Sequence, residues 1–246
     1  MQLNKVSLAE TRVFSPFFLD YIEQKNTLTP FYHRFPASEN FADQIAEKGA
    51  SFSDNHREVL VKALKKQYDT ISVSGEVEKN IASLGDRKTF TVTTGHQLNI
   101  FTGPLYFIFK IVTVINTCAR LKERHPDYNF VPVYWMASED HDYEEIKYFK
   151  LYGKKYIWET NQSGAVGRFL TDGLSALANE VPGETSIFRE AYAKNKTLGA
   201  AVRHYVNALF GAKGLIVLDA DDRDLKKQFS NVISEDVLVG SNKKVV

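Results

Sequence analysis

The feature that most constrains this chain is a strand, a loop, a long helix and a second strand that follow one another over residues 89–136. Residues 89–94 alternate apolar and β-branched polar side chains, which is typical of a strand. Pro104 suits the first position of a helix that we expect over residues 104–122, and the second strand spans residues 130–136. A crossover of this length joins parallel strands with right-handed winding. The unit therefore predicts a parallel sheet.

The expected helix carries the longest apolar run of the chain, from Pro104 to Leu121. Because this run contains Lys110 and Asn116 and falls short of the ~20 apolar residues that a membrane span needs, we expect a buried helix. Pro132 in the second strand indicates an edge position or a bulge. One stripe of the helix is expected to face the core: Leu105, Ile108, Ile111, Val112, Ile115 and Ala119.

The first 85 residues are expected to form a helical region that packs on the core. Ser53 can cap a helix whose apolar residues recur at helical spacing as far as Tyr68. A second short helix should be followed by Gly85 in the left-handed conformation of a C-cap. We place the domain boundary between residues 85 and 86.

The remaining residues, 86–246, are expected to form a Rossmann-like core. Strands that alternate with helices make the chain an α/β protein with a parallel sheet. Residues 230–246 show no helix or strand that would close the layer, so we expect an incomplete core. Within the core we predict a β-hairpin insertion at about residues 146–160, helices near 184–194 and 197–210, and a buried strand over 214–219.

Charge and cysteine content narrow the function classes. Lys and Arg number 31 against 30 Asp and Glu, and this balance argues against a domain devoted to nonspecific nucleic-acid binding. A single cysteine, Cys118, excludes an internal disulfide and fits a reducing cytoplasm. The first ten residues lack the apolar core of a secretion signal. We therefore expect a cytoplasmic protein with no nucleic-acid or membrane partner.

The first candidate site is the loop between the carboxyl end of the first strand and the amino end of the long helix. Ligands of open α/β sheets bind at such places, and a helix amino end offers free N–H groups to phosphates. Gly95 would let the backbone approach a ligand, and Gly103 would permit a tight entry into the helix. His96 and Gln97 could donate to phosphate oxygens. The loop matches neither a P-loop nor a dinucleotide fingerprint, and a polar loop with glycines for geometry is the alternative.

The second candidate site is an acidic stretch over residues 138–145, directly after the second strand. Five carboxylates within seven residues repel one another, which raises their pKa values unless cations or donors compensate. They could bind a substrate amine, a hydroxyl network or Mg²⁺, or provide a general base. His141 among them would be held in its charged form more readily. The alternative is a solvated acidic turn that caps the following element.

Residues after the last strand are weaker candidates. Asp219, Asp221 and Asp222 could contact a ribose or a metal, although such residues more often cap the next helix. Arg168 could contact an anion from a loop, and Cys118 is expected to be a small buried residue rather than a nucleophile. No cysteine or histidine pairing has the spacing of a zinc site.

Both candidate segments carry a resemblance to a known family. The segments TTGHQ (93–97), FTGPLYFIFK (101–110), VPVYWMASEDHDYEE (131–145) and GLIVLDADD (214–222) are similar to those of the bacillithiol biosynthesis cysteine-adding enzymes. The resemblance implies a ligase that joins cysteine to glucosaminyl-malate in the last step of bacillithiol synthesis. It also implies a Rossmann-like core that resembles class I aminoacyl-tRNA synthetases and binds a nucleotide at the strand ends.

The same resemblance places Thr94, Gly95, His96 and Gln97 where the first phosphate-binding signature of the synthetases lies, and Glu139, Asp140, His141 and Asp142 on the substrate side. We predict that ATP, with Mg²⁺, is held by Thr94, Gly95, His96, Gln97 and Gly103. We also predict His96, Asp140 and His141 as catalytic residues and Glu139, Asp142 and Tyr106 as substrate-binding residues. Coiled-coil helices in the family imply a homodimer, and this chain corresponds to an N-terminal portion that ends before them.

Two other interpretations remain open. The chain could be a nucleotidyltransferase that moves AMP to a different acceptor, or a non-catalytic protein that binds a nucleotide or a thiol metabolite. All three interpretations depend on one spatial prediction. The loop before Pro104 and the acidic stretch near His141 must meet at the same edge of a parallel sheet and form a single pocket.

Overall fold

The computed structural model describes residues 4–240, and the chain forms two compact units that divide after Ser51. The smaller unit contains the helices α1 (Pro16–Ile22) and α2 (Phe41–Ser51) and the 3-10 helices η1 (Asn26–Phe31) and η2 (Ser38–Asn40). An edge-on aromatic contact between Tyr21 and Tyr32 and the contacts of His33 and Arg34 with Glu47 hold this unit together.

The larger unit is built on a parallel sheet of β1 (Thr89–Gln97), β2 (Asn129–Ala137) and β5 (Ile216–Asp219). The strand order is β1-β2-β5, and the register pairs the last residue of β1, Gln97, with the last residue of β2, Ala137. The predicted strand–helix–strand unit and the buried last strand are confirmed. β1 runs on to Gln97 instead of ending at residue 94.

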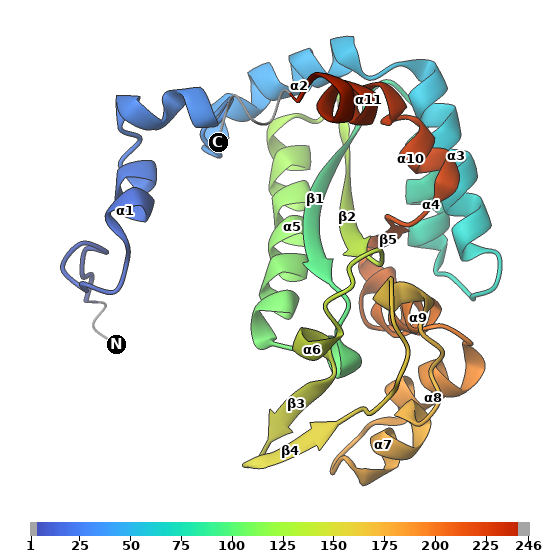
Figure 1. Cartoon of the computed structure of the whole chain (residues 1–246). Coiled ribbons are helices and arrows are strands. Elements are labelled where there is room, and N and C mark those ends of the chain that lie inside the picture. The colour runs from blue at the N-terminus through green and yellow to red at the C-terminus, as the bar shows by residue number, and fades with distance from the viewer. Residues whose placement is uncertain (1–3, 241–246) are drawn as a thin grey trace. The chain divides into compact units, whose positions relative to one another are not determined.

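Helices cover both faces of the parallel sheet. Figure 1 shows α5 (Leu105–Arg124) on one side of the strands and α3 (Asp54–Tyr68) and α4 (Gly75–Ser83) on the other. Side chains of β2 alternate between these layers: Tyr134 packs in the cluster that contains α5 and α9 (Leu198–Phe210), and Val133 packs in the cluster of α3 and α4. The connection from β1 to β2 and the connection from β2 to β5 both run over the face that α5 and α9 cover. Within the described residues, the strand order therefore advances in one direction.

The buried face of α5 matches the predicted stripe only in part. Ile111 is buried and Ile108 and Ile115 pack partly buried against the core, but Leu105, Val112 and Ala119 are exposed. The buried side chains of the helix are Phe107, Ile111, Val114, Cys118 and Leu121. The first turns of α5 are apolar on most sides, so helical periodicity alone allowed two stripes. The sheet selects the stripe that begins at Phe107, whose ring packs edge-on against Tyr134 of β2. The prediction of a buried Cys118 is confirmed.

The helices before β1 begin as predicted but end differently. Ser53 caps α3 by accepting a hydrogen bond from the His56 N–H. Gly85 does not adopt the predicted left-handed conformation. The buried guanidinium of Arg57 donates to the Leu84 carbonyl at 3.0 Å and to the Thr89 carbonyl at 3.1 Å, so the end of α4 is satisfied by a side chain. Because α3 and α4 belong to the unit of the sheet, the chain divides after Ser51 and not at the predicted residue 85.

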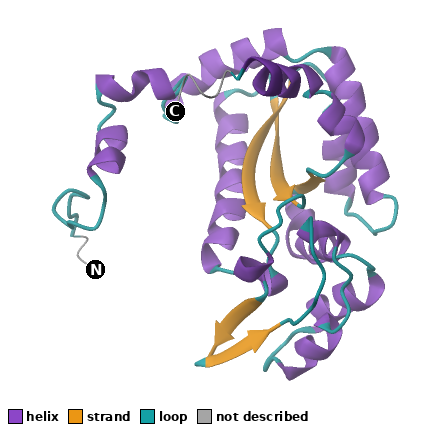
Figure 2. Cartoon of the chain, viewed as in Figure 1, coloured by secondary structure: helices purple, strands orange, loops and turns teal. Residues whose placement is uncertain are grey.

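A β-hairpin follows β2, as predicted. Its strands β3 (Tyr148–Leu151) and β4 (Lys154–Ile157) are antiparallel, and Tyr152 and Gly153 adopt positive φ angles of 49° and 79° in the turn. Figure 2 shows this hairpin beyond the carboxyl ends of the parallel strands. The short helix α6 (Tyr143–Ile146) precedes it, and η4 (Val166–Arg168), α7 (Leu174–Glu180) and the predicted helix α8 (Ser186–Lys194) follow it.

Two further expectations are corrected by the structure. Pro132 lies in the central strand and not at an edge; β5 pairs with β2 only from Val133 onward, so the missing N–H of Pro132 costs no bond to β5. No helix or strand was predicted after residue 230, but residues there form the helix α11 (Ser230–Val239). The short helix α10 (Arg223–Lys227) precedes it. The rest of the predicted irregular tail, residues 241–246, lies outside the described residues.

The connections near the sheet are short. The 3-10 helices η3 (Ile100–Thr102) and η5 (Gly211–Lys213) lead into α5 and β5, respectively. In the part of the chain that the structure describes, no helix combines the length and apolar character of a membrane-spanning segment.

Candidate functional site

The two candidate segments meet at one edge of the sheet. β1 and β2 end side by side at Gln97 and Ala137, and the Gln97 side-chain amide donates to the Asp140 carboxylate at 3.2 Å. The prediction that both segments meet at one edge is therefore confirmed, because parallel strands bring their carboxyl ends to the same edge. The predicted single pocket is formed only in part, because Glu145 is the one residue of the acidic stretch that lines the cavity there.

A cavity of about 410 Å³ lies beside this edge. Its walls come from the end of β1, the loop before α5, the first turn of α5, and the segment from α6 to β3. The lining residues are His96, Gln97, Asn99, Gly103, Pro104, Tyr106, Glu145, Tyr148, Phe149 and Lys150. Four of the predicted site residues are among them: His96, Gln97, Gly103 and Tyr106. The size lies in the range of small-molecule binding sites.

His96 is the most buried polar side chain of the cavity wall, with an exposed fraction of 8%. Its ring stacks on Phe107 at 5.3 Å and lies 5.0 Å from the Tyr106 ring. Burial, with a smaller contribution from the charge of Lys110, lowers the pKa of His96 to about 4. The imidazole is therefore neutral at pH 7, and within residues 4–240 its buried Nε2 has no hydrogen-bond partner.

We expect the stability of the protein to fall in mild acid because of His96. The pKa of His96 lies below the 6.5 of an unperturbed histidine, so the unfolded chain binds the proton more readily. Stability is therefore lost as the pH drops from about 6.5 toward 4. Between about pH 7.5 and pH 5, His96 should lower the free energy of unfolding by about 2 kcal/mol.

Urea unfolding of the wild type and of His96→Phe at both pH values measures this contribution, because phenylalanine keeps the ring stack and does not titrate. His141→Gln, which removes an exposed histidine, serves as the control. Equal pH dependence of the wild type and His96→Phe would contradict the expectation.

The loop before α5 has an unusual backbone that is held from several sides. Phe101 and Thr102 have positive φ angles of 53° and 72°, which non-glycine residues seldom adopt. The Phe101 N–H donates to the Tyr192 hydroxyl at 2.9 Å, and the Tyr205 hydroxyl donates to the Asn99 carbonyl at 2.7 Å. Such strain persists where the surroundings fix it, which is common at binding sites.

The amino end of α5 opens onto the cavity without a side-chain cap. Pro104 is the N-cap residue, and not the first helical residue as predicted. Gly103 has a φ of 64°, and the Asn99 side chain lies so close that an added Cβ would be 2.5 Å from Asn99 Cγ. Gly103, Pro104 and Tyr106 line the cavity, so the positive end of this long helix lies at the cavity wall.

Thr94 and Gly95 do not line the cavity, in contrast to the prediction. Gly95 is exposed, and its carbonyl accepts a hydrogen bond from the Lys110 ammonium at 2.6 Å. The reason is the extension of β1 to Gln97, which places these residues within the strand instead of in the loop.

The acidic stretch contributes little to the cavity wall. Asp140 accepts hydrogen bonds from the Asp142 N–H at 2.9 Å and from Gln97, and these bonds hold its pKa below the usual range. Asp142 caps α6 by accepting from the Glu145 N–H. Glu139 and His141 are exposed and lie outside the lining. The stretch thus behaves in part as the capping turn of the alternative interpretation.

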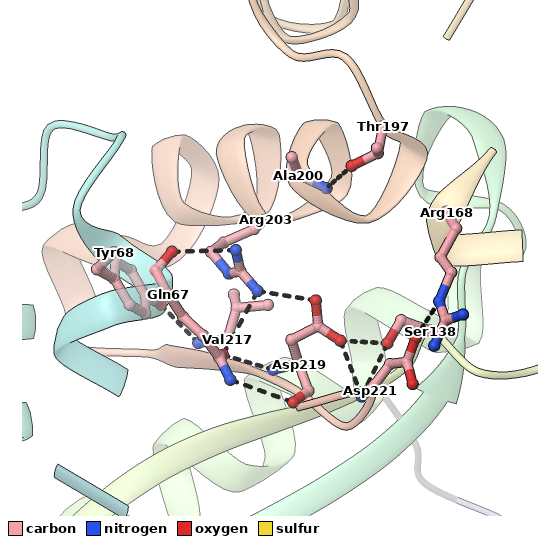
Figure 3. A network of polar contacts seen from close by, with 10 residues as sticks. All are labelled: Gln67, Tyr68, Ser138, Arg168, Thr197, Ala200, Arg203, Val217, Asp219 and Asp221. Carbon is pink, nitrogen blue, oxygen red and sulfur yellow. Dashed lines mark hydrogen bonds and ion pairs between the residues drawn. The ribbon is translucent and has the colours of Figure 1, made fainter. Parts of the chain in front are cut away.

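A polar network behind the acidic stretch fixes its first residue (Figure 3). The buried Arg203 donates to the Asp219 carboxylate at 3.1 Å and to the Gln67 carbonyl at 3.0 Å. The same carboxylate accepts hydrogen bonds from the Ser138 hydroxyl and, at 3.0 Å, from the Asp221 N–H. Helices α3 and α9 are thereby tied to the carboxyl ends of β2 and β5.

Asp221 and the segment around η4 complete this network. Arg168 and Lys226 each contact the Asp221 carboxylate at 2.6 Å, so Arg168 is paired and not a free anion contact. The N–H groups of Val166 and Gly167 donate to the carbonyls of Asp140 and Ser138 at 2.7 and 2.8 Å. Asp222 caps α10, as expected for a residue after a strand. The network therefore holds the acidic stretch in place.

Sequence reasoning missed the cavity residues of the hairpin side. Glu145 belongs to the acidic stretch but was not singled out, and Tyr148 and Lys150 lie in the predicted hairpin. A signal was present, because a hairpin directly after a strand end has to lie near that edge of the sheet. In the described residues, no group of three His, Cys, Asp or Glu side chains could hold a metal ion.

The comparisons with known proteins agree with the resemblance. The family model described as bacillithiol biosynthesis BshC, N-terminal Rossmann-like domain, matches residues 1–246. A relative from Flavobacterium psychrophilum, named "Putative cysteine ligase BshC", is 46% identical over 258 residues, which cover 100% of this chain and 49% of the relative.

More distant relatives carry the same name. The protein from Cytophaga hutchinsonii is 42% identical over 96% of this chain and 45% of its own length. The protein from Chlorobaculum tepidum is 28% identical over 91% of this chain and 44% of its own length. The chain thus spans about half the length of these curated relatives. We conclude that it belongs to the BshC family of bacillithiol biosynthesis and carries the N-terminal Rossmann-like domain of that family.

Proposed function

We propose that this chain forms the substrate-binding part of a ligase that joins cysteine to glucosaminyl-malate in the last step of bacillithiol biosynthesis. The relatives are named for cysteine ligation, and the cavity lies at the carboxyl edge of a parallel sheet, where enzymes of this architecture bind their ligands. The observation that carries the proposal is that His96 and Gln97 of the TGHQ segment, the start of α5 and the segment from α6 to β3 line one cavity.

The cavity has features that suit an anionic group such as the phosphates of ATP. The uncapped amino end of α5 and the ammonium group of Lys150 both present positive charge at the cavity wall. When bound there, ATP would supply a good leaving group to a carboxyl group. Mg²⁺ would enter with the phosphates, because it needs only one or two protein carboxylates beside them.

The residues of the chain would bind and position the reacting groups. Amide formation needs an amine close to a carboxyl carbon and a group that accepts the amine proton. His96 and Gln97 would contact the ligand from β1, and Asp140 would act as a positioning residue for Gln97. Tyr106, which was predicted from the sequence as a substrate-binding residue and lines the cavity, would bind substrate. Glu139, His141 and Asp142 lie outside the cavity, so we assign them no contact with the reacting atoms.

The test is product formation from cysteine, ATP and glucosaminyl-malate, followed by mass spectrometry. The chain is assayed alone and with the separately purified C-terminal half of the Flavobacterium psychrophilum relative. We expect product that depends on all three compounds, and a decrease of at least tenfold in kcat/KM for His96→Ala and Gln97→Ala.

The full-length relative is the positive control for the assay. Product from the relative, with none from the folded chain in either mixture, would contradict the proposed function. A product that forms equally well without cysteine would contradict it as well.

A further inference from the structure

Two side chains of opposite charge line the cavity without partners. Glu145 is on α6 and Lys150 is on β3, and across residues 4–240 neither side chain makes an ion pair or a hydrogen bond. Their neighbours differ: Lys147 pairs with Glu144 at 2.8 Å, and Lys154 pairs with Glu180 at 3.8 Å. Among the charged side chains from Glu144 to Lys154, the two without an ion pair are thus the two that line the cavity.

The backbone that carries these two side chains is well fixed. Ile146, next to Glu145, is buried with an exposed fraction of 1%, and Asp142 caps the first turn of α6. β3 is held by its pairing with β4 and by the stacked rings of Phe149 and Tyr156 at 5.2 Å. Both charges are therefore presented from rigid elements, which favours recognition of a ligand with matching geometry.

We propose that this cavity binds a small zwitterion, with the ammonium group of the ligand at Glu145 and its carboxylate at Lys150. A carboxylate and an ammonium group on one wall select the opposite groups on one molecule. The amino end of α5, which also lines the cavity, favours a second anionic group, and the amides of Gln97 and Asn99 suit hydroxyl or carbonyl groups.

The identity of the zwitterion rests on the proposed function, which supplies two candidates with this chemistry. Cysteine carries one ammonium group and one carboxylate, and the amino-sugar acceptor carries an ammonium group and carboxylates on a larger frame. Both candidates would place an ammonium group at Glu145 and a carboxylate at Lys150. A comparison of cysteine with the amino-sugar acceptor in one experiment decides which of the two the cavity binds.

Calorimetric titration of the purified chain tests the proposal without ATP or product. One arm uses L-cysteine, its decarboxylated form cysteamine and its deaminated form 3-mercaptopropionate. The other arm uses glucosaminyl-malate, D-glucosamine and malate. The variants are Glu145→Gln and Lys150→Gln, and the controls are Glu144→Gln and Lys154→Gln, which remove charges that face away from the cavity wall.

The expected result is a crossed pattern in at least one arm. Glu145→Gln should lower the affinity for the zwitterion about tenfold and leave the affinity for the ligand without an ammonium group unchanged. Lys150→Gln should lower the affinity for the zwitterion to a similar degree and leave the affinity for the ligand without a carboxylate unchanged. The arm that shows this pattern identifies the ligand of the cavity, and unchanged melting temperatures of the variants establish that the fold is intact.

Three results would overturn the proposal: wild-type protein that binds neither zwitterion, variants that weaken binding no more than the controls, or variants that affect both fragments alike. The outcome is separable from that of the ligase assay. A crossed pattern without product would refute the proposed function alone, and product without a crossed pattern would refute the zwitterion site alone.

Discussion

Replacement of Arg203 with methionine is expected to lower the free energy of unfolding by about 4 kcal/mol, as measured by urea denaturation at neutral pH. The guanidinium is buried and donates to the Asp219 carboxylate and to the Gln67 carbonyl. Its removal leaves a partly buried carboxylate without its cation, and that loss costs more than an exposed ion pair contributes. Because Asp219 also accepts from Ser138, the acidic stretch should loosen and ligand binding should weaken.

Two further variants make this expectation specific to the buried pair. Lys226→Met removes a cation from Asp221 in the same network, but Lys226 is 46% exposed, so we expect a loss below about 1 kcal/mol. Asp219→Asn combined with Arg203→Met should cost less than the sum of the two single changes, because the charge that Arg203 compensates is then absent. A loss for Arg203→Met as small as that for Lys226→Met would refute the argument.

Gly103→Ala is expected to destabilise the protein by about 3 kcal/mol and to abolish ligand binding in the cavity. The new Cβ would lie 2.5 to 2.7 Å from Asn99 side-chain atoms, at a φ of 64° that side chains rarely adopt. Asn99 cannot move away without cost, because its carbonyl accepts from the Tyr205 hydroxyl. The loop that leads into α5 would have to shift, and with it the wall that contains His96 and Tyr106.

Gly153→Ala is the matched control for this change. Gly153 also has a positive φ, 79°, but nothing lies within 4 Å of an added Cβ, and the residue is in the hairpin turn outside the cavity lining. It should show the conformational cost alone, about 1 kcal/mol, with binding unchanged. Thermal unfolding measures the loss of stability of both variants, and calorimetric titration with the zwitterions named above measures their loss of binding. Equal losses in Gly103→Ala and Gly153→Ala would mean that the contact with Asn99 has no consequence.

Local patterns predicted much of the secondary structure. The alternation in residues 89–94, the turn at Gly153 and the cap at Ser53 depend on residues close in sequence, and all three features are present. Helix α11 was missed because its apolar residues do not fall on one stripe. The Gly85 prediction was wrong for another reason: a buried side chain from α3, Arg57, satisfies the end of α4. Sequence spacing carries no signal of such a contact.

The sequence predicted where the site lies in the fold better than which side chains line it. The TGHQ segment and the acidic stretch lie at one edge, since parallel strands leave no other arrangement. Yet Glu139, His141 and Asp142 are outside the cavity, and Lys150 is inside. Which side chains face a cavity depends on how α6 and the hairpin turn back toward α5, and that path is set by contacts of residues far apart in sequence.

By itself, the sequence determined the α/β class, the parallel pairing of the two strands that α5 connects, and the resemblance that the family match confirmed. These features follow from residue periodicity and from motifs of adjacent residues. Only the tertiary structure decided which stripe of α5 is buried, that Pro132 lies in the central strand, and that Glu145 and Lys150 face one cavity. The physical reason is that burial and charge pairing depend on distances in space. Such distances are fixed when the sheet, the helices and the hairpin pack together.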